Sequence, residues 1–479
     1  MTKKTRLILL GGVLVAAVGA AAAMSLSKEA REDIRESGEG VFELPADQVT
    51  AVSWTWAKDG EGETSLAFRR SDDADGWICE EDEAFPVDGE KIGELLDQFA
   101  ELRAAFVIED VTDYAQYGLE DPVCTIGLSA GDTDYEILVG NFSELDSQRY
   151  LTFGNGIVYL VDEDPMDVYE ATLDDFLLGD DIPVFPEVET VSFSGAEDQT
   201  IQRDEDGGSY REEDIYYLDG KPLDTDRVED YLTHLTALGL TDYATYKADE
   251  ADLAEYGLDD PELTVAVTYK DLETEETETV TVAASRAPAD RETPWADVAE
   301  ALASAEESGE TSAYDDAVAY LRVGESAIIY EIGYDDLAEI LTCSYDDLCH
   351  TEVLPAEYEN VQSLTFDLDG ETYTFTRTEA ADGDEAAKWS FNNTEIDITD
   401  VENALAELSV SGFGTGSAGA EEISLTAVLD LEGTPEVSVA LFRADGASCI
   451  ARVDGEQIGS VSRSQAVALI EAVNAIVLN

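Results

Sequence analysis

The chain has 479 residues and carries 109 acidic side chains against 26 Lys and Arg, which gives a formal net charge of −83 at pH 7. A charge of this size and sign repels nucleic acid and anionic lipid head groups, so neither is expected as a partner. The acidic residues are spread along the whole chain, as on a solvated acidic surface, and the length exceeds the roughly 100–200 residues of one ordinary domain. The sequence therefore predicts an acidic protein of several domains that binds no nucleic acid.

An uncharged apolar segment follows basic residues at the N-terminus. Residues 7–26 contain no charged side chain, and a helix of this length, at about 1.5 Å per residue, spans roughly 30 Å, the hydrocarbon core of a bilayer. Because the basic residues precede it, the positive-inside rule places the N-terminus in the cytoplasm and residues 28–479 outside. We expect an uncleaved membrane anchor at 1–27, with a signal peptide cleaved near Ala23 as the alternative.

A six-residue motif occurs twice in the sequence. Its copies are Tyr117-Gly118-Leu119-Glu120-Asp121-Pro122 and Tyr256-Gly257-Leu258-Asp259-Asp260-Pro261. Each follows a short segment that opens with an aspartate suited to cap a helix, Asp113 or Asp252. The glycine suits the left-handed position after a helix, and the proline, which cannot continue a helix, precedes a β-rich run.

The motif is therefore predicted to be a capped helical turn that leads into a strand. A role of Asp121 and Asp260 as ligands or acids is the alternative. The residues assigned to this structural motif are Tyr117, Gly118, Leu119, Asp121, Pro122, Tyr256, Gly257, Leu258, Asp260 and Pro261.

Strand and helix patterns recur at matching distances in three units. The strand-like runs 49–54, 188–193 and 361–366 alternate apolar and polar residues, and each is followed by another strand-like run and then by a helical pattern. The aspartates that stand before the three helices, and that suit N-caps, are Asp88, Asp224 and Asp397. The apolar residues assigned to these helices are Ile92, Leu95, Leu96, Phe99, Leu102, Val228, Tyr231, Leu232, Leu235, Leu238, Val401, Leu405 and Leu408.

The second unit is longer than the first. Hairpins that turn at glycine are predicted after Tyr150 and Tyr320, and these two tyrosines lie further apart in the sequence than the two motif copies do, so the second unit holds an insertion. The insertion lies near 286–316 and contains a helix-like segment from Trp295 to Glu307. Insertions occur in surface loops, which often carry function, so this one is a candidate contact site.

These patterns divide the chain into five segments. A membrane anchor at 1–27 and an acidic tether of uncertain order at 28–47 precede repeat domains at 48–185, 186–355 and 356–479. The third repeat is degenerate, because it lacks the motif and is rich in Gly and Ser in its place. Strands grouped around one long helix predict an α+β fold, in which tandem domains each pack a mainly antiparallel sheet with helices behind one N-terminal transmembrane helix.

The order of these elements resembles a known family. A strand with an aromatic residue at Trp77–Cys79, a helix, the Tyr-Gly-Leu motif, two strands and a Tyr-Leu-x-x-Gly hairpin are similar to the bacterial domain-of-unknown-function family 4340 over residues 48–355, and more weakly beyond. The resemblance implies extracytoplasmic domains on an N-terminal membrane anchor, with an accessory role in ABC-type transport systems of the gliding type. No catalytic residues are established for that family, so none is carried over to this chain.

Histidine and cysteine give weak signals in this chain, which has two His and five Cys. His234 falls in a predicted helix and is expected to be a structural or surface residue. Cys343 and Cys349, next to His350, fit the usual zinc spacing poorly, and a disulfide between these two cysteines is left open. No hydrolase, phosphate-binding, dinucleotide-binding or zinc-protease motif is present. No cofactor, metal or catalytic residue is therefore predicted.

Three acidic turns offer a second interpretation of the charge. Residues 73–76, 204–207 and 367–370 contain D-x-D-G at predicted hairpin turns, but none completes a calcium-binding EF-hand loop. Weak surface binding of Ca²⁺ is therefore an alternative to a merely solvated acidic surface.

The leading hypothesis is a membrane-anchored extracytoplasmic binding or scaffold protein with a protein partner in a membrane complex, such as an ABC-type transporter. One alternative is a cell-envelope structural or adhesive protein that binds wall polymer or cations. An extracellular hydrolase has less support, because no catalytic motif occurs. The predicted location is the cell membrane, with a single pass and the bulk of the chain extracytoplasmic.

Overall fold

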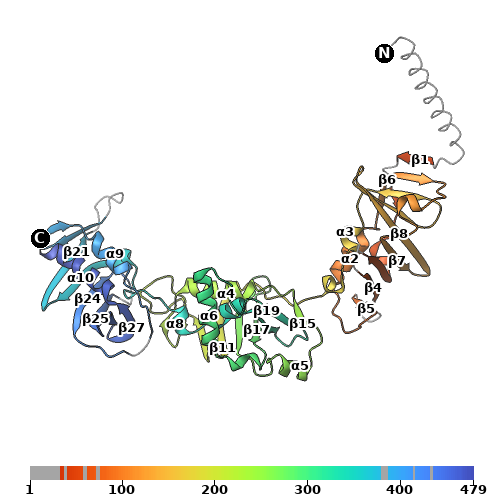
Figure 1. The fold of residues 1–479 in the computed structure, drawn as a ribbon. Coiled ribbons are helices and arrows are strands. Elements are labelled where there is room, and N and C mark those ends of the chain that lie inside the picture. The colour runs from red at the N-terminus through yellow and green to blue at the C-terminus, as the bar shows by residue number, and fades with distance from the viewer. Residues whose placement is uncertain are drawn as a thin grey trace, which may run out of the picture. The chain divides into compact units, whose positions relative to one another are not determined.

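The computed structural model describes residues 33–36, 40–57, 62–71, 76–378, 387–413, 416–431 and 435–478. The chain divides into two compact units between Gly179 and Asp180 (Figure 1). The predicted anchor at 1–27 lies outside the described residues. Within them, no helix is both long enough and apolar enough to cross a bilayer.

One antiparallel sheet, the first sheet, forms the frame of the first unit. Its described strands follow the order β1-β6-β10-β9-β8-β7-β3-β4-β5, and β2 also pairs with β6. The strands are β1 (Asp33–Glu36), β2 (Gly40–Phe42), β3 (Ala51–Ala57), β4 (Glu63–Arg70), β5 (Trp77–Cys79), β6 (Leu102–Glu109), β7 (Cys124–Ala130), β8 (Thr133–Ser143), β9 (Gln148–Thr152) and β10 (Val158–Val161). The helices are η2 (Ala46–Gln48), α2 (Gly89–Asp97), η3 (Ala115–Tyr117), α3 (Met166–Tyr169) and η4 (Leu173–Phe176).

The second unit contains two antiparallel sheets. The second sheet has the order β14-β13-β12-β11-β16-β17-β18-β19-β15, and the third sheet has the order β23-β22-β21-β20-β24-β25-β26-β27. The strands of the second sheet are β11 (Glu187–Gly195), β12 (Gln199–Arg203), β13 (Tyr216–Leu218), β14 (Lys221–Pro222), β15 (Tyr243–Thr245), β16 (Leu263–Lys270), β17 (Thr277–Ser285), β18 (Val318–Val323) and β19 (Ile329–Gly333). Those of the third are β20 (Val361–Leu368), β21 (Glu371–Thr378), β22 (Lys388–Phe391), β23 (Thr394–Ile396), β24 (Glu421–Leu429), β25 (Glu436–Arg443), β26 (Ser448–Val453) and β27 (Glu456–Ser462).

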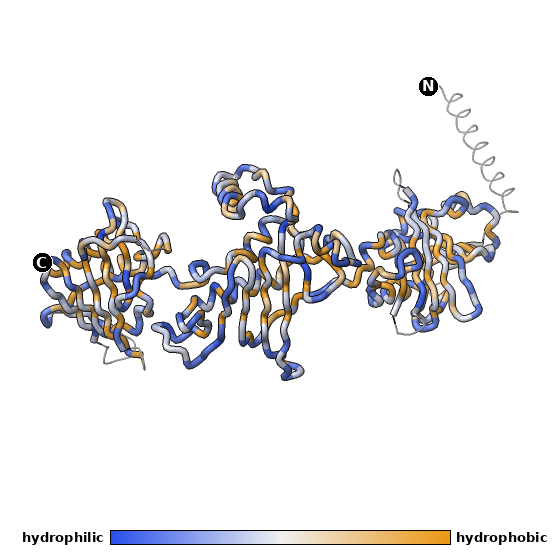
Figure 2. The backbone as a smooth tube through the Cα atoms, turned by 90° about the horizontal axis from the view of Figure 1, so that it is seen from below, coloured by the Kyte–Doolittle hydropathy of each residue, from blue (hydrophilic) through white to orange (hydrophobic). Residues whose placement is uncertain are grey.

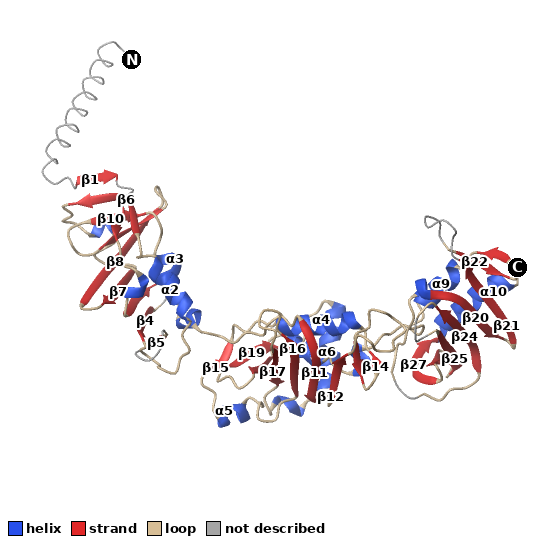
Figure 3. Cartoon of the chain, turned by 180° about the vertical axis from the view of Figure 1, so that it is seen from behind, coloured by secondary structure: helices blue, strands red, loops and turns tan. Residues whose placement is uncertain are grey.

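The helices of the second unit lie between these strands in chain order and are drawn in blue in Figure 3. They are α4 (Thr225–Thr236), α5 (Glu250–Glu255), η5 (Asp290–Glu292), α6 (Trp295–Ser308), α7 (Tyr334–Leu341), α8 (Tyr345–Leu348), η6 (Tyr358–Asn360), α9 (Thr399–Ala406) and α10 (Arg463–Val477). The α+β class with antiparallel sheets is therefore confirmed.

All three sheets share one strand order, as the internal repeat predicts. The first strand of each repeat, β3, β11 or β20, pairs with its hairpin partner on one side and with β7, β16 or β24 on the other. From β7, β16 or β24 the chain continues through three neighbouring strands, which are β8-β9-β10, β17-β18-β19 or β25-β26-β27. The third sheet has no described counterpart of β6 and β15, which pair with the last strand of the first two repeats. At that edge Gly412 forms a single antiparallel bridge with Ser460 of β27.

Alternating burial along the strands builds the cores. Val52 and Trp54 of β3 are buried, whereas Ser53 between them is exposed, as the two-residue period of a strand requires. Figure 2 shows hydrophilic and hydrophobic residues mixed in this way along the sheets. In the second sheet α4 covers the apolar face, where the ring centroid of Tyr231 lies 5.5 Å from that of Phe193 in β11. The sheets therefore bury one face against helices and expose the other.

Two of the three predicted helix caps are confirmed. Asp88 and Asp224 occupy the N-cap positions of α2 and α4, and each carboxylate accepts hydrogen bonds from two backbone N–H groups of the first turn. The prediction for Asp397 is wrong by one residue, because Ile398 occupies the N-cap position of α9. The Asp397 carboxylate instead accepts hydrogen bonds from N (3.0 Å) and Oγ1 (2.7 Å) of Thr399.

The predicted helices extend too far at their C-terminal ends. Phe99 and Leu102 lie beyond α2, and Leu102 is the first residue of β6. Leu238 lies beyond α4, and Leu408 lies beyond α9. Phe99, Leu102 and Leu408 are nonetheless buried. Apolar residues at helical spacing do not fix where a helix stops, because a subsequent turn or strand can bury them equally well.

The residues predicted to form an acidic tether, 28–47, include the strands β1 and β2. β1 and β2 both pair with β6, which would otherwise present unpaired N–H and C=O groups at the sheet edge. The ring of Phe42 packs against those of Phe99, Tyr135 and Phe153, with centroid distances of 4.7–6.5 Å. Polar composition concealed this strand pairing, which depends on a partner strand far along the chain.

The glycine hairpins and the insertion helix are confirmed. Gly154 and Gly156 have positive φ between β9 and β10, and Gly324 has positive φ between β18 and β19. The insertion begins where β17 ends at Ser285, and its helix-like segment forms α6. The insertion is therefore a structured addition to the second sheet.

Candidate functional site: motif joints and a histidine cluster

The first copy of the motif closes a small apolar cluster. Tyr117 ends η3, Leu119 follows it, and both side chains are buried. They pack with Ile108 of β6 and Val158 of β10. The ring centroid of Tyr117 lies 5.0 Å from that of Tyr150 in β9. The motif therefore meets the glycine hairpin that was predicted separately, and the two features form one joint.

The second copy has the same plan with a longer helical turn. Tyr256 follows α5, Leu258 is buried, and the ring centroid of Tyr256 lies 4.5 Å from that of Tyr320 in β18. Gly118 and Gly257 have φ angles of 69° and 76°, which confirms the left-handed conformation predicted for the motif glycines.

The aspartates before each copy are not the N-caps that were predicted. Asp249 is the N-cap of α5, and the Asp252 carboxylate accepts a hydrogen bond from Asp249 N at 2.9 Å to complete a capping box. In the first copy Tyr114 holds the cap position, and Asp113 accepts a hydrogen bond from the backbone N–H two residues later, at 3.1 Å. Both aspartates still satisfy orphan N–H groups at a helix start, which is the chemistry that their position indicated.

The acidic residues of the motif face away from these joints. Asp121 and Asp260 are exposed, while Pro122 and Pro261 are partly buried and lead into β7 and β16. The structure thus brings the Tyr, Gly and Leu of each copy together with a hairpin, and it leaves the aspartates at the surface. The arrangement matches a structural turn.

A buried ionic network, formed with residues of the insertion, supports the second copy. The Arg286 side chain is 2% exposed and its Nη2 lies 2.7 Å from Oε1 of Glu262, the residue after Pro261. Arg286 also donates to the carbonyl oxygen of Thr293 at 2.9 Å. Arg291 Nη2 donates to the carbonyl oxygen of Gly257 at 2.6 Å. The insertion is therefore tied to the motif through two guanidinium groups.

The network also fixes the charge on Glu262. Burial acts to raise the pKa of Glu262, but hydrogen bonds from Arg286 and the positive charges of Arg286 and Arg291 outweigh it and hold the pKa below its ordinary value of 4.5. The Arg286 guanidinium carbon also lies 5.3 Å from the ring centroid of Trp295 at the start of α6. The ion pair therefore stays charged at neutral pH and holds α6 in place.

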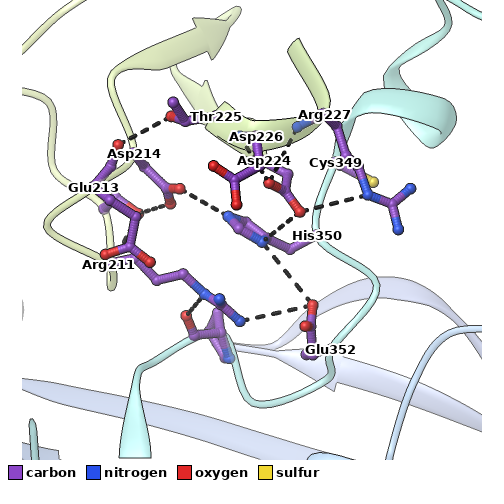
Figure 4. Close-up of polar contacts among 12 residues, drawn as sticks. Arg211, Glu213, Asp214, Asp224, Thr225, Asp226, Arg227, Cys349, His350 and Glu352 are labelled. Carbon is purple, nitrogen blue, oxygen red and sulfur yellow. Dashed lines mark hydrogen bonds and ion pairs between the residues drawn. The ribbon is translucent and has the colours of Figure 1, made fainter. Parts of the chain in front are cut away.

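A second polar cluster surrounds His350, between the start of α4 and the chain that leaves the second sheet (Figure 4). His350 Nε2 lies 2.8 Å from Oδ1 of Asp214, and Nδ1 lies 3.4 Å from Oδ2 of Asp224 and 4.0 Å from Oε2 of Glu352. Ser209 Oγ donates a hydrogen bond to the other Asp214 oxygen. Carboxylates therefore face both nitrogens of the imidazole ring.

The central side chains of this cluster are buried, although most acidic residues of the protein are expected at the surface. The Asp214 side chain is 1% exposed and that of His350 is 12% exposed. Two guanidinium groups complete the cluster, with Arg227 Nε at 3.4 Å from Asp224 Oδ2 and Arg211 Nη2 at 3.7 Å from Glu352 Oε2. The hydroxyl of Ser209 donates its hydrogen bond to Asp214.

The cysteines are buried, unreactive thiols. All five are free, including Cys343 and Cys349, for which a disulfide was left open. Burial raises the pKa of Cys124 and of Cys343 to about 12, and that of Cys349 to about 11. Because the thiolate is the reactive form, these groups are poor nucleophiles at neutral pH. Cys79 and Cys124 fill buried strand positions as small hydrophobic residues.

The acidic turns serve the hairpins. Asp369 and Gly370 have positive φ and join β20 to β21, and residues 204–207 follow the end of β12. The turn at 73–76 falls almost entirely outside the described residues. Across the part of the chain that the structure describes, no three His, Cys, Asp or Glu side chains are arranged to hold a metal ion.

Comparison with known sequences places the chain in a family. Residues 77–261 and 217–427 each match the sequence model of a domain of unknown function, DUF4340. Together the matches cover residues 77–427, which is most of the chain. The chain belongs to the DUF4340 family. No curated protein and no solved structure matches it.

The two DUF4340 matches reflect the internal repeat. They begin at Trp77 in β5 and at Tyr217 in β13, and these strands hold equivalent places in the first two sheets. The first match ends at Pro261, the last residue of the second motif copy. One DUF4340 match therefore runs from the third strand of one repeat into the next repeat.

Sequence reasoning missed both polar clusters of this DUF4340 protein. His350 was considered only for zinc spacing, yet its partner Asp214 lies 136 residues earlier in the chain. Arg286 was placed at the start of the insertion without a partner. The scarcity of basic residues was the available signal, because a rare cation inside an acidic chain has many anions to pair with.

Proposed function

We propose that this protein is a membrane-anchored extracytoplasmic binding or scaffold protein, whose sheets present their open faces to a protein partner in a membrane transport complex of the ABC type. The anchor at 1–27 and the single-pass location are part of the proposal. They rest on the uncharged apolar run at 7–26 and on the basic residues before it.

The observation that carries the proposal is an acidic groove on the open face of each of the first two sheets. The groove on the first sheet has a volume of about 500 Å³. Hydroxyl groups form its floor, including Thr55 and Ser65, whose side-chain oxygens lie 2.8 Å apart across β3 and β4. Glu81, Asp134 and Glu136 also line it, and none of its described lining residues is Lys or Arg.

The groove on the second sheet repeats this chemistry. It has a volume of about 600 Å³ and lies over β11, β12 and β13. Thr200 forms part of its floor, and Asp198, Asp204 and Asp219 line it. Its described lining residues also include no Lys or Arg. Open faces with hydroxyl groups and an unbalanced negative charge favour a partner that presents basic side chains and backbone amides.

The test is cross-linking in intact cells, followed by affinity purification of the full-length protein in mild detergent and identification of the proteins that accompany it. Recovery of transporter subunits supports the proposal. Recovery of the protein alone overturns it, and recovery with wall material only overturns it in favour of a cell-envelope structural or adhesive role.

A matched pair of variants locates the contact. Glu81→Lys with Glu136→Lys reverses two charges in the first groove, and Glu144→Lys with Glu163→Lys makes the same change in charge at exposed sites of the first unit outside the groove. We expect partner recovery to fall about tenfold for the groove variant and to stay unchanged for the control. Equal losses would attribute binding to overall charge and contradict a groove contact.

The insertion needs a different variant. Deleting residues 286–316 would remove Arg286 and leave Glu262 without its partner, so a lost contact could not be separated from unfolding. Glu300 and Glu307 are exposed on α6. Their replacement by lysine leaves the ionic network intact and tests whether α6 takes part in the contact.

A further inference from the structure

The segment that leaves the second sheet is held from two sides. His350 contacts Asp214 and Asp224, which belong to the second sheet and the start of α4. The residues that follow His350 pair with the segment between α9 and β24 of the third repeat, where Glu352 forms an antiparallel bridge with Ser409. Val353 N donates to the carbonyl oxygen of Leu408 at 3.0 Å, and Val410 N donates to that of Thr351 at 2.7 Å. A short stretch of chain therefore links the cluster directly to the third repeat.

A loop between β12 and β13 reaches the same place. Tyr210 packs against the apolar core of the third repeat and donates a hydrogen bond to Asp454, in the turn between β26 and β27. Its neighbour Arg211 donates from Nε to the carbonyl oxygen of Pro355 at 3.0 Å and pairs with Glu352. The loop thus holds the linking segment against the third sheet, a few residues from Asp214.

The charged groups around the His350 ring favour its protonated, cationic form. Three carboxylates face His350, and two guanidinium groups pair with two of these carboxylates. One negative charge is left, on the nearly inaccessible Asp214, and an imidazolium would neutralise it. Glu213 and Asp226 stand around the cluster in Figure 4 and add negative charge, while burial keeps the Cys349 thiol neutral by raising its pKa to about 11.

The two ring nitrogens are held unequally by these carboxylates. An imidazolium donates from both nitrogens, whereas a neutral imidazole keeps one donor and turns a lone pair toward a carboxylate on the other side. Nδ1 is buried and makes no hydrogen bond, so the Asp224 and Glu352 side is the weaker side. If Nε2 keeps its proton for Asp214, loss of the second proton is felt at Asp224 and Glu352, and Glu352 is the residue that bridges to Ser409 of the third repeat.

We propose that His350 is a proton-operated latch: its protonation fastens the linking segment 351–355 between the second and third sheets, and its deprotonation frees the Glu352 side. Histidine is the side chain whose charge ordinarily changes between about pH 5 and 8, so this is the range in which the latch is tested. The stabilisation that the imidazolium gives is present at the acid end of this window and is lost as the pH rises. The inference does not depend on the proposed function.

Glu213 and Glu357 form an acidic pair next to the linking segment. The stabilisation that this pair gives also decreases as the pH rises. A side-chain hydrogen bond from Glu213, then burial, then the charges of Glu213 and Glu359 raise the pKa of Glu357. A carboxyl group with a raised pKa stabilises the folded state when it is protonated, and the stabilisation is lost as the pH rises through the folded-state value. Its window begins near 4.5, the ordinary pKa of a glutamate.

The test is hydrogen exchange of the full-length protein from pH 5 to 8, corrected for intrinsic exchange rates, at the amides of Val353 and Val410. We expect their protection to fall at least tenfold as the pH rises. In His350→Gln the protection should be low and independent of pH. In His234→Gln, the matched control, it should follow the parent protein, because His234 is exposed on α4 and is the only other histidine.

Glu352→Gln keeps the test decisive if His350→Gln fails to fold. It removes one carboxylate from a side chain that is 40% exposed, and it should lower the midpoint of the pH dependence by about 0.5–1 pH unit. The two histidines also allow each imidazole titration to be followed separately by NMR, with His234→Gln identifying its own signal. Protection that does not change with pH in the parent protein overturns the latch. So does a pH dependence that survives His350→Gln, or a midpoint that Glu352→Gln leaves in place.

Discussion

The two copies of the six-residue motif share one backbone and differ in what supports it. The first copy, at Tyr117, closes an apolar cluster with Ile108 and Val158. The second copy, at Tyr256, packs against Tyr320 and is also tied to a buried Arg286–Glu262 pair. A local turn can therefore be kept while an insertion adds a buried ion pair to its surroundings.

The difference follows from the insertion. The residue after the proline is Val123 in the first copy and Glu262 in the second. The insertion of the second repeat supplies Arg286 and Arg291, which pair with Glu262. A carboxylate at this partly buried position needs a cation, and the insertion needs an anchor. The pair meets both needs, so the glutamate and the insertion are expected to depend on each other.

Replacing Arg286 should have the largest effect on this comparison. Arg286→Leu leaves the Glu262 carboxylate partly buried without its partner, and breaking a buried pair in this way costs about 3–5 kcal/mol. The measurement is urea unfolding followed by hydrogen exchange of the β16 amides, which report on the second sheet. Arg69→Leu is the control, because the Arg69–Glu83 pair is exposed and should contribute about 0–1 kcal/mol.

Removing both charges sharpens the result. Glu262→Leu with Arg286→Leu should recover part of the loss, since no unpaired charge then remains. If the double variant were as unstable as Arg286→Leu alone, packing of the guanidinium on Trp295 would be the main contribution, and the ionic account of the second copy would be wrong.

Truncating the motif leucine tests what the copies share. Leu119 and Leu258 are 3% and 7% exposed, so each change to alanine removes buried apolar contact and should cost about 2–4 kcal/mol. The two losses should be similar, because both leucines turn inward at the same point of the motif. Unfolding of each unit, followed by exchange at β7 and β16, measures them separately. A loss of stability in only one copy would show that the two leucines pack differently although the backbone is shared.

Substituting the motif glycine should change the stability of the two copies by different amounts, and the difference should be smaller than the effects above. Both glycines have positive φ, and alanine there costs about 1 kcal/mol in either copy. At Gly118 the new Cβ would meet the side chain of Asn141, which can move. At Gly257 it would lie 2.5 Å from the backbone oxygen of Arg286, which the ionic network holds in place. Gly257→Ala should therefore be the more destabilising change, and equal effects on the unfolding midpoints would contradict a rigid network.

Much of the fold could be predicted from local patterns. Alternation along 49–54 and its two relatives located β3, β11 and β20, because a half-buried strand repeats every two residues. The motif glycines were predicted correctly because a helix that ends in the left-handed conformation favours glycine. Helix ends were predicted poorly, since Leu102 and Leu408 fit a helical period but are buried in the segments after the helices.

Contacts between distant segments were not predictable in this way. β1 and β2 look polar in sequence, and only the open edge of β6 explains why they form strands. A repeated arginine was also overlooked, although all three repeats contain it at the end of the second strand, opposite an aromatic residue of the third. The pairs are Arg70 with Trp77, Arg203 with Tyr216, and Arg377 with Trp389.

The candidate sites were less predictable than the fold, for an electrostatic reason. In a chain with 109 acidic residues, no carboxylate stands out, so Asp214 and Glu262 could not be chosen as partners for His350 and Arg286. Their identification required the burial and the geometry that the fold creates. Rare basic residues were the better guide, since a buried cation nearly always has a partner.

Acid should weaken the second copy selectively, and this is the smallest of the expected effects. The pKa of Glu262 is below its ordinary value of 4.5 in the folded protein, so the unfolded chain binds the proton more readily. The stabilisation from this carboxylate is therefore fully present above about pH 4.5 and is lost as the pH falls through the folded-state pKa. Because one proton is involved, the change spreads over one to two pH units.

The pH dependence of β16 exchange in the parent protein and in Glu262→Gln measures this contribution. The difference between the two proteins should be constant above pH 5 and should shrink below pH 4.5, because the parent protein then also carries an uncharged side chain at this position. Exchange at β7, next to the first copy, should show no such difference, since Val123 stands at the place of Glu262. A difference that grew with acid would mean that Glu262 is protonated in the folded state, and the ion pair could not be what holds the insertion to the motif.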